Sequence, residues 1–185
     1  MYKKCLTERS ANRQRELEQG LLGMMQQKNY EDITVSDLCQ HLQIPRKSFY
    51  RYFSGKDGAL HALIDHTLVD FFKVPKEMEN RKSGLDDLML FFSYWYENRI
   101  FLKALQRSGL SGIWMERANA FAMREGYIPR QFKFLPPEKQ NIAMSFVICG
   151  LLSMTLNWYR QGFPISAGEM TRLATEMLTT PLLRP

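Results

Sequence analysis

Apolar side chains recur at helical spacing along this chain, and their period limits the possible folds more than any other feature. The pattern is clear in one segment, where the spacing i, i+3, i+7, i+10, i+11 is occupied by Leu85, Leu88, Phe92, Trp95 and Tyr96. No segment shows sustained alternation of apolar and polar residues, and Pro and Gly divide the chain into pieces of helix length. The sequence therefore predicts an all-α protein with about nine helices.

Capping and breaking residues set the expected helix boundaries. Thr34 is a good N-cap, Pro45 lies near the first turn of the next helix, and Gly162 with Pro164 marks a turn. The predicted helices cover about Thr7–Gln27, Thr34–Leu42, Arg46–Phe53, Lys56 to just before Pro75, Gly84–Glu97, Ile100–Arg107, Ile113–Glu125, a charge-poor helix ending near Arg160, and Ser166–Leu178. The expected division of the chain is residues 1–55, a connecting helix at 56–75, and a larger helical part at 76–185.

Composition places the chain among soluble globular proteins. Its 185 residues are 45% hydrophobic and 24% charged, which allows a buried core. Cys5, Cys39 and Cys149 are odd in number and lack metal-type spacing, so we expect no disulfide framework and no metal site. The basic N-terminal stretch has no apolar segment behind it, which predicts no signal peptide and an intracellular location.

Basic residues concentrate between Asp37 and Asp57, although the net charge of the whole chain is only +6. This stretch has no acidic residue, and its basic residues are Arg46, Lys47, Arg51 and Lys56. On a helix that starts at Arg46, steps of about 100° per residue put Phe49 and Phe53 on one face. The opposite face carries Lys47, Ser48 and Arg51. One side is therefore predicted to join a small core and the other to be basic; the expected core residues are Tyr30, Ile33, Leu38, Phe49 and Phe53.

Two short helices joined by a tight turn, the second with a basic outer face, form a helix-turn-helix. The second helix of this motif enters the major groove of DNA. The run NYEDITVSDLCQHLQIPRKSFYRYFSGKDGALHALID resembles the DNA-binding region of the TetR family of bacterial transcription regulators, with its TV-x-D-L helix and its F-Y-x-Y-F ending. The match is strong from Tyr30 to Leu63, extends back to Leu17 and weakens beyond Pro75. Gln43 stands where the family often has Gly, and Pro45 replaces the usual Ser cap.

This resemblance implies a homodimeric, cytoplasmic DNA-binding regulator without a cofactor. It assigns residues 1–55 to DNA binding and 76–185 to regulation and to dimerisation through the last two helices, with a palindromic double-stranded operator as partner. Base edges would be contacted by Arg46, Lys47, Ser48 and Tyr50. Phosphates would be held by Thr34, Ser36, Tyr52 and Lys56, with Arg51 on the same basic face. A repressor released by a small molecule is the first expectation; an activator or coregulator without ligand response is the alternative.

Aromatic residues of the C-terminal part could line a cavity for a small apolar or aromatic ligand, although packing is the simpler role for aromatic residues at helical spacing. The candidate ligand contacts are Phe92, Trp95, Tyr96, Trp114, Phe121, Phe146 and Cys149. No nucleophile, phosphate-binding loop or paired-carboxylate pattern indicates catalysis, so we expect no enzyme.

Gln140–Tyr159 has no charged residue and is long enough to cross a bilayer as a helix. Six of its residues are nevertheless polar, namely Gln140, Asn141, Ser145, Ser153, Thr155 and Asn157. Helices that are apolar almost all round occur in protein cores and dimer interfaces as well as in membranes. We therefore expect a buried or interface helix and no membrane, with a membrane-attached protein as the alternative from another class.

Overall fold

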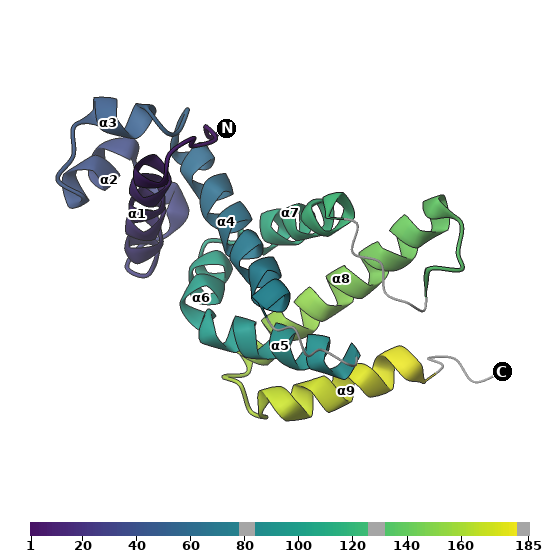
Figure 1. The fold of residues 1–185 in the computed structure, drawn as a ribbon. Coiled ribbons are helices and arrows are strands. Elements are labelled where there is room, and N and C mark those ends of the chain that lie inside the picture. Colours follow the sequence, from purple (N-terminus) through teal and green to yellow (C-terminus); the bar gives the residue numbers. More distant parts are fainter. Residues whose placement is uncertain (78–83, 126–131, 181–185) are drawn as a thin grey trace. The chain divides into compact units, whose positions relative to one another are not determined.

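The computed structural model of the chain describes residues 1–77, 84–125 and 132–180. Within these residues the fold is all-α, with nine α-helices, one short 3-10 helix and no strand (Figure 1). The helices are α1 (Glu8–Met25), η1 (Tyr30–Asp32), α2 (Val35–His41), α3 (Arg46–Tyr50), α4 (Lys56–Glu77), α5 (Gly84–Glu97), α6 (Arg99–Arg107), α7 (Ser111–Arg124), α8 (Pro137–Arg160) and α9 (Ala167–Thr179). The predicted fold class is confirmed.

Two predicted helix ends are wrong. The third helix was expected to reach Phe53 but ends at Tyr50, because the chain then turns to bury the Phe53 side chain, which is 1% exposed. The fourth was expected to stop before Pro75 but continues to Glu77. Pro75 therefore lies in the last turn of α4, where its missing amide hydrogen leaves the backbone carbonyl of Phe71 without its usual donor.

The chain forms two compact units. The first consists of Met1–Leu68 and Lys103–Trp114, and the second of Val69–Leu102 and Met115–Pro185. Three helices, α4, α6 and α7, therefore contribute residues to both units.

The first unit has a continuous apolar core under α1, α2, α3 and the first half of α4. The expected core residues Tyr30, Ile33, Leu38, Phe49 and Phe53 are all buried, which confirms that prediction. They pack with residues of α1 and α4 that are 1% exposed or less, among them Leu17, Leu21, Met25, Leu60 and Leu63.

The end of α6 belongs to this first unit and caps the C-terminal end of α1. Arg107 donates from Nη1 to the carbonyl oxygen of Gln26 at 2.9 Å and from Nη2 to that of Gln27 at 2.7 Å. Ser108 accepts a hydrogen bond from the backbone amide of Tyr30 at 3.0 Å. These contacts satisfy backbone groups that lie outside the helical ladder.

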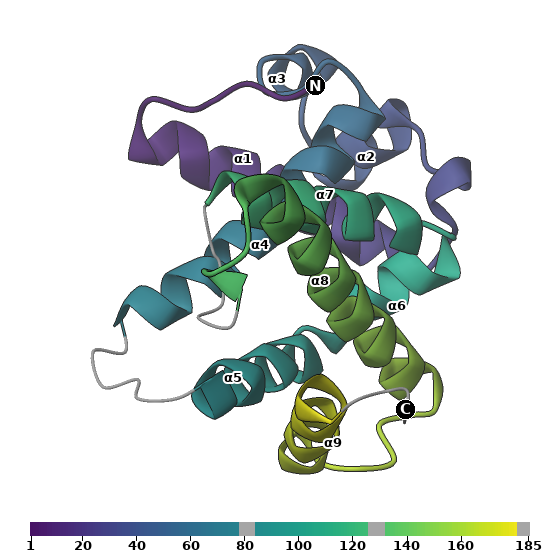
Figure 2. The ribbon, with the colours of Figure 1, turned by 90° about the vertical axis from the view of Figure 1, so that its right-hand side faces the viewer.

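The second unit is built around α5, α8 and α9, and Figure 2 shows α5 and α9 side by side. One buried cluster joins these three helices and consists of Phe92, Trp158, Met170 and Ala174. The edge of the Phe92 ring meets the Trp158 ring, with centroids 6.0 Å apart, and the Trp158 indole donates to the carbonyl oxygen of Ile165 at 2.9 Å.

Candidate nucleic-acid interface

The N-terminus of α2 is fixed by a capping box between Thr34 and Asp37. The backbone amide of Thr34 donates to Oδ2 of Asp37 at 2.9 Å, and the amide of Asp37 donates to Oγ1 of Thr34 at 3.1 Å. The Thr34 hydroxyl accepts in this pair and keeps its own proton for an external acceptor. Ser36, in the first turn, is exposed. Two of the three hydroxyls predicted to hold phosphates, those of Thr34 and Ser36, therefore lie at one exposed helix end.

The turn between α2 and α3 depends on a left-handed residue. Gln43 has φ +52°, and the amides of Gln43 and Ile44 donate to the carbonyl oxygens of Gln40 and Cys39 at 3.1 and 2.9 Å. This is the Schellman arrangement, in which the left-handed position favours Gly. Glycine adopts this left-handed conformation without steric cost, which explains why the TetR family often has Gly at this position.

The recognition-helix candidate α3 has one buried side and one exposed side, as its sequence predicts. Phe49 is fully buried, whereas Arg46 and Lys47 are exposed and Tyr50 is 43% exposed. Nη2 of Arg46 lies 3.4 Å from the Tyr50 hydroxyl, and this contact raises the pKa of Arg46. Ser48 is half-buried and Arg51 is exposed. The structure thus brings two of the predicted base-reading residues, Arg46 and Tyr50, into contact, and it leaves Lys47 exposed on the same helix.

Lys56, predicted to hold a phosphate, is engaged inside the first unit. Its Nζ donates to the carbonyl oxygens of Tyr30 and Glu31 at 2.7 and 3.3 Å, and lies 4.2 Å from the centroid of the Tyr30 ring. The Tyr30 hydroxyl in turn donates to Oδ1 of Asp57 at 2.5 Å, and burial together with this carboxylate raises the pKa of Tyr30. Lys56 therefore ties η1 to the start of α4, with one of its three protons left for a phosphate.

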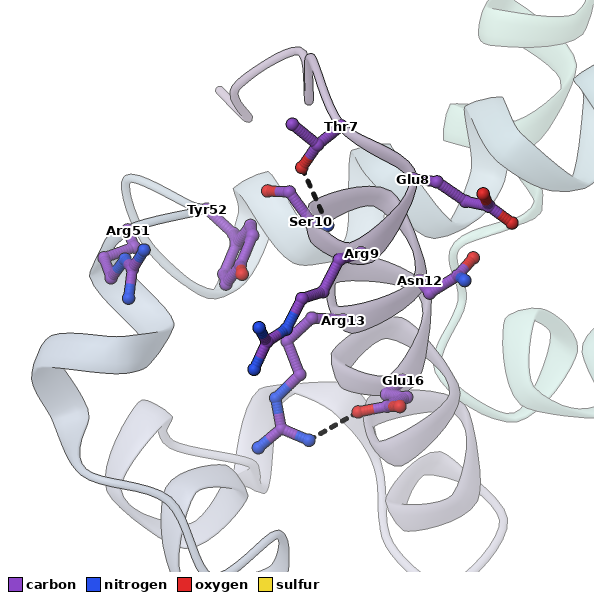
Figure 3. A pocket seen from close by; sticks show the side chains of 9 residues that line it. All are labelled: Thr7, Glu8, Arg9, Ser10, Asn12, Arg13, Glu16, Arg51 and Tyr52. Atoms are coloured by element: carbon purple, nitrogen blue, oxygen red, sulfur yellow. Dashed lines mark hydrogen bonds and ion pairs between the residues drawn. The ribbon is translucent and has the colours of Figure 1, made fainter.

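The segment before α1 docks against the chain that follows α3. The amide of Lys3 donates to the carbonyl oxygen of Tyr52 at 2.9 Å, and the amide of Ser54 donates to that of Met1 at 3.0 Å. A β-bridge pairs Tyr2 with Phe53. Tyr52 is half-buried and lines a groove with Arg51 and the first half of α1 (Figure 3). Sequence reasoning missed this groove because pairing between residues so far apart in the chain has no local signal.

The seven ligand-contact candidates do not share one environment. Trp114 is buried and belongs to the first unit, whereas the other six belong to the second. Phe92, Trp95 and Phe121 are buried among other aromatic rings. Tyr96 and Phe146 are 43% and 66% exposed, and Cys149 is half-buried.

Asn119, in α7, is a polar residue that sequence reasoning did not single out. Its Oδ1 is buried and has no hydrogen-bond partner within the described residues. A buried acceptor without a donor is costly, so this atom is a candidate contact for a bound group that donates a hydrogen bond. Nothing distinguishes Asn119 in the sequence from an exposed helical Asn.

The class of protein follows from this geometry and from its match to known sequences. Residues 22–63, which contain α2, the turn, α3 and the start of α4, match the family described as bacterial regulatory proteins, tetR family. The helix-turn-helix segment of this chain is therefore of the TetR type.

One similar sequence is that of DhaS, the HTH-type dhaKLM operon transcriptional activator of Lactococcus lactis subsp. lactis (strain IL1403). The two are 29% identical over 82 residues, which cover 44% of this chain and 42% of DhaS. The match therefore spans less than half of that relative.

Solved structures share the fold over most of the chain. That of the dihydroxyacetone kinase operon activator DhaS has a TM-score of 0.55 at 15% identity and covers 89% of this chain and 93% of its own. That of the fatty acid degradation regulator FadR from Bacillus halodurans has a TM-score of 0.62 at 12% identity, with coverage of 97% and 98%. At these identities the likeness is one of fold.

Proposed function

We propose that this chain regulates transcription by binding a double-stranded operator through α3. The observation that carries the proposal is the two-sided character of α3, where Phe49 anchors the helix in the core and leaves Arg46 and Lys47 exposed. Arg and Lys can donate to O6 and N7 of guanine in the major groove. Residues 1–55 carry this activity in the proposal, and residues 76–185 carry regulation and dimerisation.

Base contacts and phosphate contacts have separate residues in this proposal. Arg46, Lys47, Ser48 and Tyr50 read base edges. Thr34, Ser36, Arg51, Tyr52 and Lys56 hold the backbone in register, because hydroxyls and cations bind phosphate oxygens without reading sequence. The capping box at Thr34 supports this role by fixing the first turn of α2, and the contacts of Lys56 support it by joining the start of α4 to η1.

Selection of genomic fragments on the purified chain, followed by binding titrations over a salt series, tests the proposal. An Arg46→Ala, Lys47→Ala double variant is expected to lose about tenfold or more in affinity for the selected fragment and most of its preference over random DNA. A Lys133→Ala, Lys139→Ala variant removes the same charge from exposed residues of the second unit and serves as the control. Preference that survives unchanged in the α3 variant contradicts the assignment of α3.

We propose that the exposed apolar face of α8 packs against a second copy of the chain. Only 28% of the most apolar stretch of this helix is buried within the chain, and Ile142 and Phe146 are 73% and 66% exposed. On α9, Leu173 and Met177 are 43% and 47% exposed. Apolar side chains at this exposure favour an interface, and a two-fold dimer would present two α3 helices to a palindromic operator.

Length and composition alone would also let α8 cross a membrane, a property shared with core helices of soluble proteins. We favour a cytoplasmic dimer because the match at residues 22–63 is to a family of regulatory proteins. Cell fractionation decides between the two: a dimer in the soluble fraction excludes the membrane-attached alternative.

The proposed regulation is release of DNA on binding a small ligand within the second unit. Buried aromatic side chains supply apolar contacts there, and Oδ1 of Asn119 could accept a hydrogen bond from the ligand. A thermal-shift screen of aromatic amines and alcohols tests this. A ligand that stabilises the chain is expected to lower its affinity for the selected fragment and to lose most of its effect in Asn119→Leu.

Activation is the second candidate for the direction of control, favoured by the similarity to DhaS, which is a transcriptional activator. In vitro transcription from a promoter next to the selected fragment separates the two directions. A repressor lowers transcript yield and a ligand restores it, whereas an activator raises the yield without ligand.

A further inference from the structure

The first unit carries a basic groove beside the recognition-helix candidate, between the first half of α1 and the segment that ends α3. Its volume is about 920 Å³. It is lined by Thr7, Glu8, Arg9, Ser10, Asn12, Arg13, Glu16, Arg51 and Tyr52. We call it the arginine groove, after its three guanidinium groups. Figure 3 shows Arg9 and Arg13 projecting from α1 on the side where Arg51 and Tyr52 lie.

Two of the three arginines have no partner to neutralise them. Arg13 forms an ion pair with Glu16, one turn further along α1. Arg9 and Arg51 make no ion pair or hydrogen bond with any residue in the described parts of the chain. The groove therefore has a cation without an ion-pair partner in each wall, Arg9 from α1 and Arg51 directly after α3, although Glu8 also lines the α1 wall.

Hydrogen bonds connect the two segments that line the groove, the start of α1 and the residues after α3. The thiol of Cys5 donates to Oε1 of Gln14 at 3.0 Å, and Nε2 of Gln14 donates to the carbonyl oxygen of Lys3 at 3.2 Å. Lys3 is bonded in turn to Tyr52. This chain of contacts links the start of α1 to the segment after α3, so that the backbones carrying Arg9 and Arg51 keep a fixed separation.

The N-terminal segment before α1 packs closely against the start of α4. A Cβ atom at Gly58 would lie 2.3 Å from the carbonyl oxygen of Met1. Only glycine allows the N-terminal segment to approach α4 so closely. The Tyr2 hydroxyl adds a 2.7 Å hydrogen bond to Oδ2 of Asp65.

We propose that the arginine groove binds a backbone phosphate of the DNA duplex, outside the base pairs that α3 reads. This inference rests on the proposed function and extends the DNA contact to α1, with Arg9 as its new residue. Arg51 directly follows α3, so a duplex whose major groove holds α3 passes its phosphates close to this position. Guanidinium groups bind phosphate oxygens in a bidentate manner, and the Tyr52 hydroxyl is a further donor at the groove.

The salt dependence of binding gives a direct test. Each phosphate contact contributes about −0.9 to the slope of log K against log salt concentration, whatever the DNA sequence. The full chain is titrated by fluorescence anisotropy against a labelled mixed-sequence duplex of about 30 base pairs across a sodium chloride series. The variants are Arg9→Gln and Arg9→Gln, Arg51→Gln; Arg99→Gln, at an exposed arginine of the second unit, removes the same charge as a control.

We expect Arg9→Gln to reduce the magnitude of the slope by about 0.9 and to weaken binding at 0.1 M salt by about eightfold, and the double variant to reduce the slope by about 1.8. Preference for the selected genomic fragment over random DNA should stay at the wild-type value. Arg99→Gln should leave the slope unchanged. Because Arg9 is exposed, thermal melting should show the same fold in each variant.

Two results overturn the inference. The first is a wild-type slope in Arg9→Gln, or an equal change in Arg99→Gln, which would make the effect one of net charge. The second is a groove that takes up inorganic phosphate in an Arg9-dependent way while the duplex slope stays unchanged, which would make it a site for free anions. If the wild-type chain binds no duplex, this inference and the proposed function fail together; if Arg46→Ala, Lys47→Ala behaves as proposed and Arg9→Gln does not, this inference alone fails.

Discussion

Nδ1 of His66 lies 2.9 Å from both carboxylate oxygens of Glu18, whose side chain is 0% exposed. This pair joins the middle of α1 to α4 inside the first unit. Arg15 donates to the backbone carbonyl of His66 at 3.5 Å, and the Tyr2 ring meets the His66 ring edge-on with centroids 5.6 Å apart. The connection between the two helices is therefore polar at this point, although apolar side chains surround it.

Replacing His66 should destabilise the chain, because the buried carboxylate of Glu18 loses the contact with its imidazole. We expect His66→Leu to lower the free energy of unfolding by about 1–3 kcal/mol, because a buried acceptor loses a donor. Urea denaturation measures the change. Glu18→Gln combined with His66→Leu should recover part of the loss, since a neutral amide is less costly to bury than a carboxylate. A double variant as unstable as the sum of both single variants contradicts the pairing.

Two glycines of α1 should respond differently to the same substitution. A Cβ at Gly23 meets nothing within 4 Å, so Gly23→Ala should raise the free energy of unfolding by about 0.5–1 kcal/mol through helix propensity. A Cβ at Gly20 would lie 2.6 Å from Cδ2 of Leu42, so Gly20→Ala should gain less or lose stability. Equal gains in thermal or urea denaturation would show that α1 does not pack closely on the end of α2.

The left-handed turn before α3 gives a second matched pair. Gln43→Gly should stabilise the chain by about 0.5–1 kcal/mol, because a side chain at φ +52° carries strain that glycine avoids. Gln40→Gly makes the same replacement inside α2 and should destabilise by about 0.5–1 kcal/mol. Chemical denaturation of both variants is the measurement, and a loss of stability in Gln43→Gly contradicts the conformation described for the turn.

The capping box of α2 should make stability depend on pH. Hydrogen bonds from Thr34 lower the pKa of Asp37 below its ordinary value, and Lys28 acts in the same direction. A lowered pKa means that the ionised carboxylate stabilises the fold above the ordinary pKa and that this stabilisation is lost as pH falls through the lowered one. The difference in melting temperature between wild type and Asp37→Ala should therefore shrink on acidification from pH 7 to about 3. A difference that is constant over this range contradicts the prediction.

Charge on the exposed face of α8 should dissociate the proposed dimer without unfolding the chain. Phe146→Asp changes a side chain that is 66% exposed in the single chain, so the fold should persist while sedimentation shows a monomer. Phe134→Asp, at a residue that is 80% exposed and outside α8, makes the same change as the control. A dimer that survives Phe146→Asp would place the interface elsewhere.

Local patterns predict local structure well in this chain. Gly84–Glu97 forms a helix with the expected bounds, because an apolar face of helical period starts directly after a glycine. Pro45 predicts the break before α3, whereas nothing in the residue type of Gln43 predicts its left-handed backbone. The faces of α3 follow from the angular step per residue alone, which is why the burial of Phe49 could be predicted.

Features that depend on contacts between distant residues could not be predicted. After α3 ends at Tyr50, the chain turns to bury Phe53 and pairs it with Tyr2, and this contact joins residues far apart in the sequence. The engagement of Lys56 with the Tyr30 carbonyl oxygen, and the position of Arg9 near Arg51, likewise follow from tertiary packing. The DNA-contact residues remain predictions, because the structure shows their exposure and their contacts within the chain and no bound DNA.

The caps that Arg107 and Ser108 place on α1 and η1 bear on how such regulators could be recombined. A chimera that took residues only up to Leu68 would leave the carbonyl oxygens of Gln26 and Gln27 and the amide of Tyr30 without these partners. It would also lack the buried side chains of Leu105 and Leu110. A graft of the helix-turn-helix into another protein should therefore also include residues 103–114, the stretch of α6 and α7 that belongs to the first unit.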